Sequence, residues 1–179
     1  SGGDDELLSK WMDRGPEIGL GDNRLTIRAI KLVADGALGS RGAWLLAPYS
    51  DRIGHVGLPT MPVEDMADIS HLGYQNGFQV GIHAIGDRAN REVLDVFDEL
   101  FDGRDRGVRF RIEHAQHIDP IDIPRFGQLG VIASMQGIHL SSDRPWAIKR
   151  LGQQRIEQGA YVWRALIDSG AVLINGTDA

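Results

Sequence analysis

The apolar positions of this chain fall into short runs with two different spacings. Runs rich in β-branched residues predict five buried strands, at residues 25–34, 78–83, 108–114, 131–135 and 171–178. Apolar residues three and four positions apart predict helices at residues 6–14, 61–76, 89–101, 121–129 and 156–169. Two stretches have no clear period: we expect a long excursion at residues 35–60 and a polar loop at residues 136–154.

The order of these elements predicts an α/β fold, because strands and helices alternate from residue 25 onward. Such an order favours a parallel sheet with right-handed crossovers, and both an open doubly wound sheet and part of a (β/α)8 barrel fit it. We expect one domain over residues 1–179, with an N-terminal helix and turn at residues 1–24 and five strand-helix units at residues 25–179. No Gly-x-Gly-x-x-Gly or Walker sequence follows any predicted strand, which argues against dinucleotide and P-loop sites.

Composition narrows the function further. The formal net charge is -6 and the basic residues are scattered, so we expect no nucleic-acid partner and no anionic membrane surface. No apolar run approaches 18 residues and no signal pattern opens the chain, so we expect a cytoplasmic protein. The chain has no cysteine. Any metal would therefore be held by imidazole, carboxylate or lysine-derived ligands.

Four ionisable residues stand at or near the carboxyl ends of predicted strands: Lys31, His83, His114 and Asp178. His114 follows His83 by about one strand-helix unit of roughly 30 residues, and Asp178 follows His114 by about two. Since parallel strands end at one rim of a sheet, we expect all four side chains to gather there. Alone, each has an ordinary explanation, such as a hydrogen-bonded core histidine or a solvated lysine.

Two imidazoles and a carboxylate suit Zn, Fe, Mn or Co with an open position for water. A divalent metal, most often Zn in such sites, lowers the pKa of water toward about 7 and polarises a carbonyl. Asp178 could bind the metal, take the proton from the water and pass it to a leaving amine. Lys31 would repel a metal as an ammonium, so it must pair with a carboxylate or lose its charge, for instance by reacting with CO2 to form a carbamate.

The chain resembles the amidohydrolase superfamily, and within it the amidohydrolase-3 group that includes N-substituted formamide deformylases. The segments that carry the resemblance are residues 31–40 with Pro48 and Tyr49, then 83–89, 111–114 and 176–179. The resemblance runs in order from about Leu25 to Ala179. Each segment alone is weak, but their combination is specific.

The resemblance implies a (β/α)8 barrel that hydrolyses amide or similar bonds other than peptide bonds with one or two metals. It makes Lys31 the carboxylated lysine after the fourth barrel strand, His83 and His114 the ligands after the fifth and sixth, and Asp178 the metal-binding acid and base after the eighth. It makes residues 136–154 the substrate-facing loop, with candidate contacts at Gln136, His139, Arg144 and Trp146. The expected partner is a small amide substrate.

Two departures leave alternatives open. The family's His-x-His pair from the first barrel strand has no counterpart, and Gly137 follows Gln136 where proline is more usual. The chain thus resembles barrel strands four to eight only. A half-barrel without activity that associates with a second copy through its open edges is the alternative, and we expect a homo-oligomer on that ground. A third interpretation is an open-sheet protein that binds a small polar ligand through His83 and Asp178.

Overall fold

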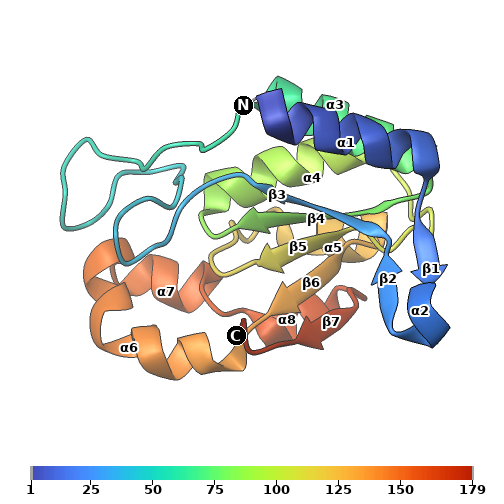
Figure 1. The fold of residues 1–179 in the computed structure, drawn as a ribbon. Helices are drawn as coiled ribbons and strands as arrows, with labels where there is room; N and C mark the ends of the chain where they lie inside the picture. The colour runs from blue at the N-terminus through green and yellow to red at the C-terminus, as the bar shows by residue number, and fades with distance from the viewer. Residues whose placement is uncertain (1, 179) are drawn as a thin grey trace.

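The computed structural model describes residues 2–178, and the side chains from Glu6 onward. Its centre is one sheet of five parallel strands that lie side by side in chain order (Figure 1). The strands are β3 (Ala29–Val33), β4 (Gln79–Ala84), β5 (Arg111–His114), β6 (Ile132–Met135) and β7 (Leu173–Asn175). The predicted α/β fold with a parallel sheet is confirmed.

One face of the sheet is covered by helices. These are α3 (Val63–Gln75), α4 (Asp87–Phe101), α5 (Ile123–Leu129) and α8 (Trp163–Asp168), and all four contribute side chains to the main core. The strand residues that face them are apolar and buried, for example Leu32, Ile82, Ile112 and Ala133. None of the helices in residues 2–178 has both the length and the apolar composition needed to cross a membrane.

The other face of the sheet carries polar groups. Register places Lys31, Gly81 and Arg111 in one row across the strands, and His83 and Glu113 in the next. Arg111 Nε lies 2.5 Å from Glu113 Oε1 above Gly81, where a Cβ atom would come within 3.0 Å of both side chains. With the exception of His114, alternation along the strands therefore separates an apolar core from a polar face.

The chain before β3 forms α1 (Gly2–Arg14), β1 (Glu17–Gly19), the short α2 (Leu20–Asn23) and β2 (Leu25–Ile27). The prediction of one strand over residues 25–34 is wrong, because β2 pairs antiparallel with β1 whereas β3 pairs with β4. The break falls at Arg28, whose carbonyl accepts a hydrogen bond from the Gln79 N–H.

The prediction of a polar loop at residues 136–154 is also wrong. These residues form α6 (Gly137–Leu151) and the start of α7 (Gln153–Gly159). Two serines and an internal Pro145 hid the helical period, but Ala147 and Leu151 of α6 are buried in a second cluster with Leu38 and Leu45. Helix α6 therefore exists because it covers the excursion that follows β3.

The helix predicted at residues 156–169 is divided between α7 and α8. Tyr161 lies between them with a φ of 56°, and its N–H donates to Gln116 O, while Ile118 N–H donates to Gly159 O. These long-range bonds replace the helical ones. The last strand ends at Asn175 rather than 178, and the resemblance at Ala179 lies outside the described residues.

The aromatic centre of the core should be sensitive to truncation. Phe97 is fully buried, and its ring centroid lies 5.7 Å from that of Phe101 and 5.2 Å from that of Phe110. We expect Phe97→Ala to lower the free energy of unfolding by about 3–5 kcal/mol, because a large cavity is left behind. Urea unfolding measures this change. Ile53→Ala, at a fully exposed position, is the control; equal effects of the two substitutions would contradict this description of the core.

Candidate active site

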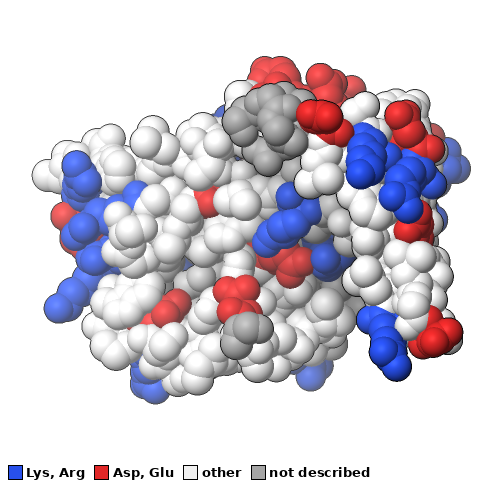
Figure 2. Space-filling model, in the orientation of Figure 1, with Lys and Arg blue, Asp and Glu red and all other residues white. Residues whose placement is uncertain are grey.

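A cavity of about 450 Å³ opens at the carboxyl ends of the strands. The four residues predicted as a site line it together, namely Lys31, His83, His114 and Asp178. His139, Asp143 and Trp146 line it from α6, and Leu38 and Gly39 from the excursion. Seen from the side of the uncovered sheet face, the molecule has a hollow where basic and acidic side chains lie close together (Figure 2). Residues dispersed over most of the chain therefore meet at one rim.

Backbone strain brings the two central imidazoles together. His114 lies opposite Ala84 in the register, so alternation would turn its side chain toward the helix-covered face, away from His83. Instead His114 has a φ of 74° and Ala115 a φ of 43°, both in the left-handed region. The ring centroids of His83 and His114 lie 4.5 Å apart. Two consecutive strained residues at a cavity are typical of a functional site.

Both imidazoles are held in the neutral state. Burial lowers the pKa of His83 to about 4. Repulsion from Lys31, and from His114 whenever that ring is protonated, acts in the same direction, against the attraction of Asp178. Burial also lowers the pKa of His114, although Gln136 and Asp178 oppose this. A neutral imidazole has a free lone pair, which is the form that binds metals.

The predicted substrate-binding residues differ in their distance from the cavity: His139 and Trp146 line it, whereas Gln136 and Arg144 are not among its lining residues. Gln136 Oε1 lies 2.7 Å from His114 Nδ1, and since an amide oxygen can only accept, Nδ1 carries the proton. The His139 ring stacks on that of His114 with centroids 5.8 Å apart. Trp146 lies against Gly39 at the cavity wall. Arg144 is exposed and is not among the cavity-lining residues, so its substrate role stays a prediction.

The resemblance placed Asp143 in the substrate-facing segment, but sequence reasoning missed the polar cluster that Asp143 forms with Gln116 and Tyr161 beside the cavity. Gln116 Nε2 donates to Asp143 Oδ2 at 2.7 Å and lies 3.0 Å from the Tyr161 hydroxyl, which donates to the same oxygen of Asp143. Burial raises the pKa of Tyr161, and the charge of Asp143 adds to this. The cluster ties α6 to the turn after β5. No motif marks it, because its three members are far apart in the sequence.

A buried carboxylate lies behind His83. Asp35 accepts hydrogen bonds from the N–H groups of Trp44, Ile85 and Gly86, at 2.8–2.9 Å. Burial raises the pKa of Asp35 to about 7, and these three bonds limit the rise. Gly86 must be glycine here, since a Cβ atom would lie 2.0 Å from Trp44 O. Asp35 thus joins the excursion to the turn that carries His83.

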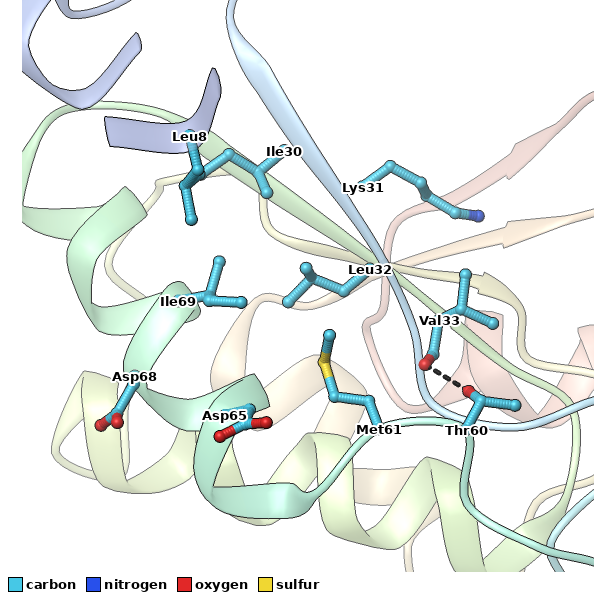
Figure 3. Close-up of a pocket in the computed structure, with 10 residues that line it drawn as sticks. All are labelled: Leu8, Ile30, Lys31, Leu32, Val33, Thr60, Met61, Asp65, Asp68 and Ile69. Atoms are coloured by element: carbon cyan, nitrogen blue, oxygen red, sulfur yellow. Dashed lines mark hydrogen bonds between the residues drawn. The ribbon is translucent and has the colours of Figure 1, made fainter. Parts of the chain in front are cut away.

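A larger cavity, of about 810 Å³, lies between α1, β3 and α3, but it contains no imidazole. Figure 3 shows Ile30 and Leu32 directed toward Ile69 and Met61, whereas Lys31 projects to the opposite side of β3. The carboxylates at its border are Asp65 and Asp68. This space is a groove beside an edge strand, whereas the candidate site residues line the smaller cavity.

The donor set suits a divalent metal but is incomplete. Within residues 2–178, no three His, Asp or Glu side chains lie close enough to hold a metal ion. The donors that do meet are of the right kind: two neutral imidazoles, the Asp178 carboxylate at the same cavity, and a lysine. These residues fit part of a metal site.

Comparison with known proteins agrees with this fold. The model of the amidohydrolase family (Amidohydro_3) matches residues 3–179. A metal-dependent hydrolase from Pyrococcus furiosus superposes with a TM-score of 0.85 at 32% identity, covering 97% of this chain and 35% of the other. One from Pyrococcus horikoshii OT3 gives a TM-score of 0.84 at 35% identity, covering 97% of this chain and 34% of the other.

Two curated relatives match almost the whole chain. Protein LONG AFTER FAR-RED 3 from Arabidopsis thaliana is 39% identical over 96% of this chain, which is 27% of that protein. The putative amidohydrolase YtcJ from Bacillus subtilis (strain 168) is 34% identical over 97% of this chain and 32% of its own length. The sheet is thus part of a (β/α)8 barrel of the metal-dependent hydrolase type. The chain belongs to the amidohydrolase family and spans about a third of the length of these relatives.

The lowered pKa of His83 predicts a pH-dependent contribution to stability. Between pH 6.5 and about 4 the unfolded chain binds a proton at this residue and the folded chain does not, so His83 destabilises the fold as the pH falls through this window. We expect wild type to lose up to about 3 kcal/mol relative to His83→Gln between pH 7 and 4. Urea unfolding of both proteins measures this.

Asp35, whose raised pKa acts in the opposite direction, is present in both proteins, so the comparison cancels the part of its contribution that does not depend on His83. A difference between wild type and His83→Gln that stays constant from pH 7 to 4 would show that the imidazole is not buried in its neutral form.

Proposed function

We propose that this chain supplies part of the active site of a metal-dependent hydrolase that cleaves carbon-nitrogen bonds other than peptide bonds, such as those of N-formyl amides. The observation that carries the proposal is the single cavity lined by Lys31, His83, His114 and Asp178. The family relationship makes hydrolysis the expected reaction class. The bond type is inferred from the resemblance to formamide deformylases.

His83, His114 and Asp178 would hold the metal, with Zn²⁺ as the ion that best suits this donor set. When bound, the metal would supply a Lewis acid for the substrate carbonyl and lower the pKa of water. Since no three acidic or imidazole ligands lie close enough together among residues 2–178, further ligands would come from other parts of the barrel. Lys31 would contribute as a carbamate, formed when its neutral Nζ attacks CO2 and loses a proton.

The chain's own groups account for the remaining roles. Asp178 is exposed at the cavity, so its carboxylate can accept a proton from water and later donate it to the leaving amine. Gln136 orients His114 through Nδ1. Trp146 and His139 form the wall where the acyl or amine portion would lie. Leu38, buried on the opposite side, gives that portion an apolar surface.

Metal titration tests the ligand assignment. In the complete barrel that contains this chain, we expect stoichiometric Zn²⁺ binding, and we expect His83→Ala or Asp178→Asn to weaken it by more than about 100-fold, beyond the 10–100-fold typical of residues behind the ligands. Isothermal titration calorimetry measures the affinities. His71→Ala is the matched control, because His71 is exposed on α3 and does not line the cavity.

Hydrolysis of N-formyl amides completes this test. Asp178→Asn should lower kcat by about 10²–10⁴-fold, the range for a lost general acid and base. Absence of Zn²⁺ binding by the wild type, or unchanged binding in His83→Ala, would argue against the proposal.

A second candidate, self-association, is favoured by the open edges of the sheet. β3 and β7 each pair with one neighbour only among the described strands, and Val33, Val172 and Ile174 are 43%, 58% and 43% exposed. Unpaired edges with apolar side chains invite pairing with a second copy. We propose a homodimer formed through these edges as the alternative.

Sedimentation velocity distinguishes this candidate. Val33→Lys combined with Ile174→Lys should convert a dimer to a monomer, since two charges would be buried in the interface. Ile53→Lys, at a fully exposed position of the excursion, should leave the dimer intact. A wild-type protein that is monomeric at micromolar concentration would exclude association through these edges.

A further inference from the structure

The nitrogen of His83 that faces the protein interior has no hydrogen-bond partner. Nε2 is buried, and its nearest charged neighbour is Asp35 Oδ1, at 3.5 Å. This separation is longer than a good hydrogen bond. A backbone hydrogen bond with Gly36 also acts on the ring and opposes the lowering of the His83 pKa. A buried N–H without an acceptor costs about 1–3 kcal/mol. A carboxylate is a stronger acceptor than the backbone carbonyl of Gly36, which favours a contact between the ring and Asp35.

Three backbone hydrogen bonds hold the carboxylate of Asp35 in a fixed orientation beside His83. Oδ2 accepts the N–H groups of Trp44 and Gly86, both at 2.8 Å, and Oδ1 accepts only that of Ile85, at 2.9 Å. An oxygen has two lone pairs, so Oδ1 retains one for the imidazole. Backbone N–H groups can only donate, which favours the ionised carboxylate over the protonated form. Ile85 and Gly86 lie two and three residues after His83 along the chain, so Asp35 and the ring move together.

We propose that Asp35 is a positioning residue for His83: its carboxylate accepts the Nε2–H and so directs the Nδ1 lone pair into the cavity that His114 and Asp178 line. The two ring nitrogens lie on different edges, and in a neutral imidazole a proton on one leaves the other free to bind. The inference rests on the proposed function, since Nδ1 would be the nitrogen offered to a metal. Carboxylates that orient histidine ligands commonly account for 10–100-fold in metal affinity.

The chain contains a matched control in a second buried pair. Asp87 Oδ2 lies 3.3 Å from His117 Nε2, and Asp87 Oδ1 accepts the N–H groups of Leu46 and Arg88. Asp87 therefore anchors the same excursion that Asp35 anchors. Neither Asp87 nor His117 lines the cavity. Asp87→Asn thus weakens the attachment of the excursion but leaves the neighbours of the His83 ring unchanged.

The test is the tautomer of His83 in the metal-free protein. Protein labelled with ¹⁵N at histidine is studied by long-range ¹H–¹⁵N correlation at pH 8, above the pKa of about 7 of Asp35, and His83→Gln assigns the signals. We expect wild type to carry the proton on Nε2. In Asp35→Asn the amide oxygen can keep the bonds from Trp44 and Gly86 while the NH₂ group faces Nε2, so the proton should move to Nδ1. Asp87→Asn should keep the wild-type tautomer.

Zn²⁺ titration gives the second readout. We expect Asp35→Asn to weaken binding 10–100-fold and Asp87→Asn to change it by less than about threefold. A wild-type His83 protonated on Nδ1 overturns the inference even if Asp35→Asn fails to fold. Equal changes in Asp35→Asn and Asp87→Asn also overturn it. If Asp35→Asn reverses the tautomer but wild type binds no Zn²⁺, the Asp35–His83 contact is supported and the proposed hydrolase function is contradicted.

Discussion

The buried carboxylate of Asp35 is the interaction on which the architecture of the site depends. It stands at the end of β3 and receives N–H groups from the excursion and from the turn between β4 and α4. Without these bonds, three buried donors and a buried carboxylate would lack partners, which is costly in a low-dielectric interior. One side chain thus fixes where the first strand of the sheet ends, how the excursion begins and where His83 lies.

The second constraint is a conflict between two requirements. Alternation along the strands assigns the side chains of His83 and His114 to opposite faces of the sheet, whereas both line the same cavity. His83 belongs to the polar face of the sheet, whereas the register assigns His114 to the other. The left-handed backbone at His114 and Ala115 resolves this conflict. Surrounding bonds hold the strained turn, including His117 N–H to Ile85 O and Tyr161 N–H to Gln116 O. The strained conformation persists because hydrogen bonds to the neighbouring turns hold it in place.

The order of strands and helices could be predicted from sequence because each unit has a local signal. Strands β4 to β6 are marked by apolar runs. Helices α3 and α4 are marked by apolar residues at helical spacing, followed by a glycine just beyond the C-terminal end of each helix. The positions of the strand ends predicted that Lys31, His83, His114 and Asp178 share one rim of the sheet, but not the backbone conformation that turns His114 toward His83. What failed was decided by tertiary contacts. Helix α6 is polar except where Ala147 and Leu151 meet the excursion, and Tyr161 breaks a helix because its N–H is used elsewhere. The Gln116–Asp143–Tyr161 cluster and the strain at His114 leave no mark in the sequence.

The attachment of α6 and α7 has a mechanical consequence. Arg150 donates to Gly39 O and pairs with Asp51, and Arg155 donates to the carbonyls of Ala47 and Pro48. Both arginines thereby fasten these helices to the excursion rather than to the sheet. These bonds join the two walls of the cavity directly to each other, so a larger substrate would have to displace both walls together from the strand ends rather than separate them.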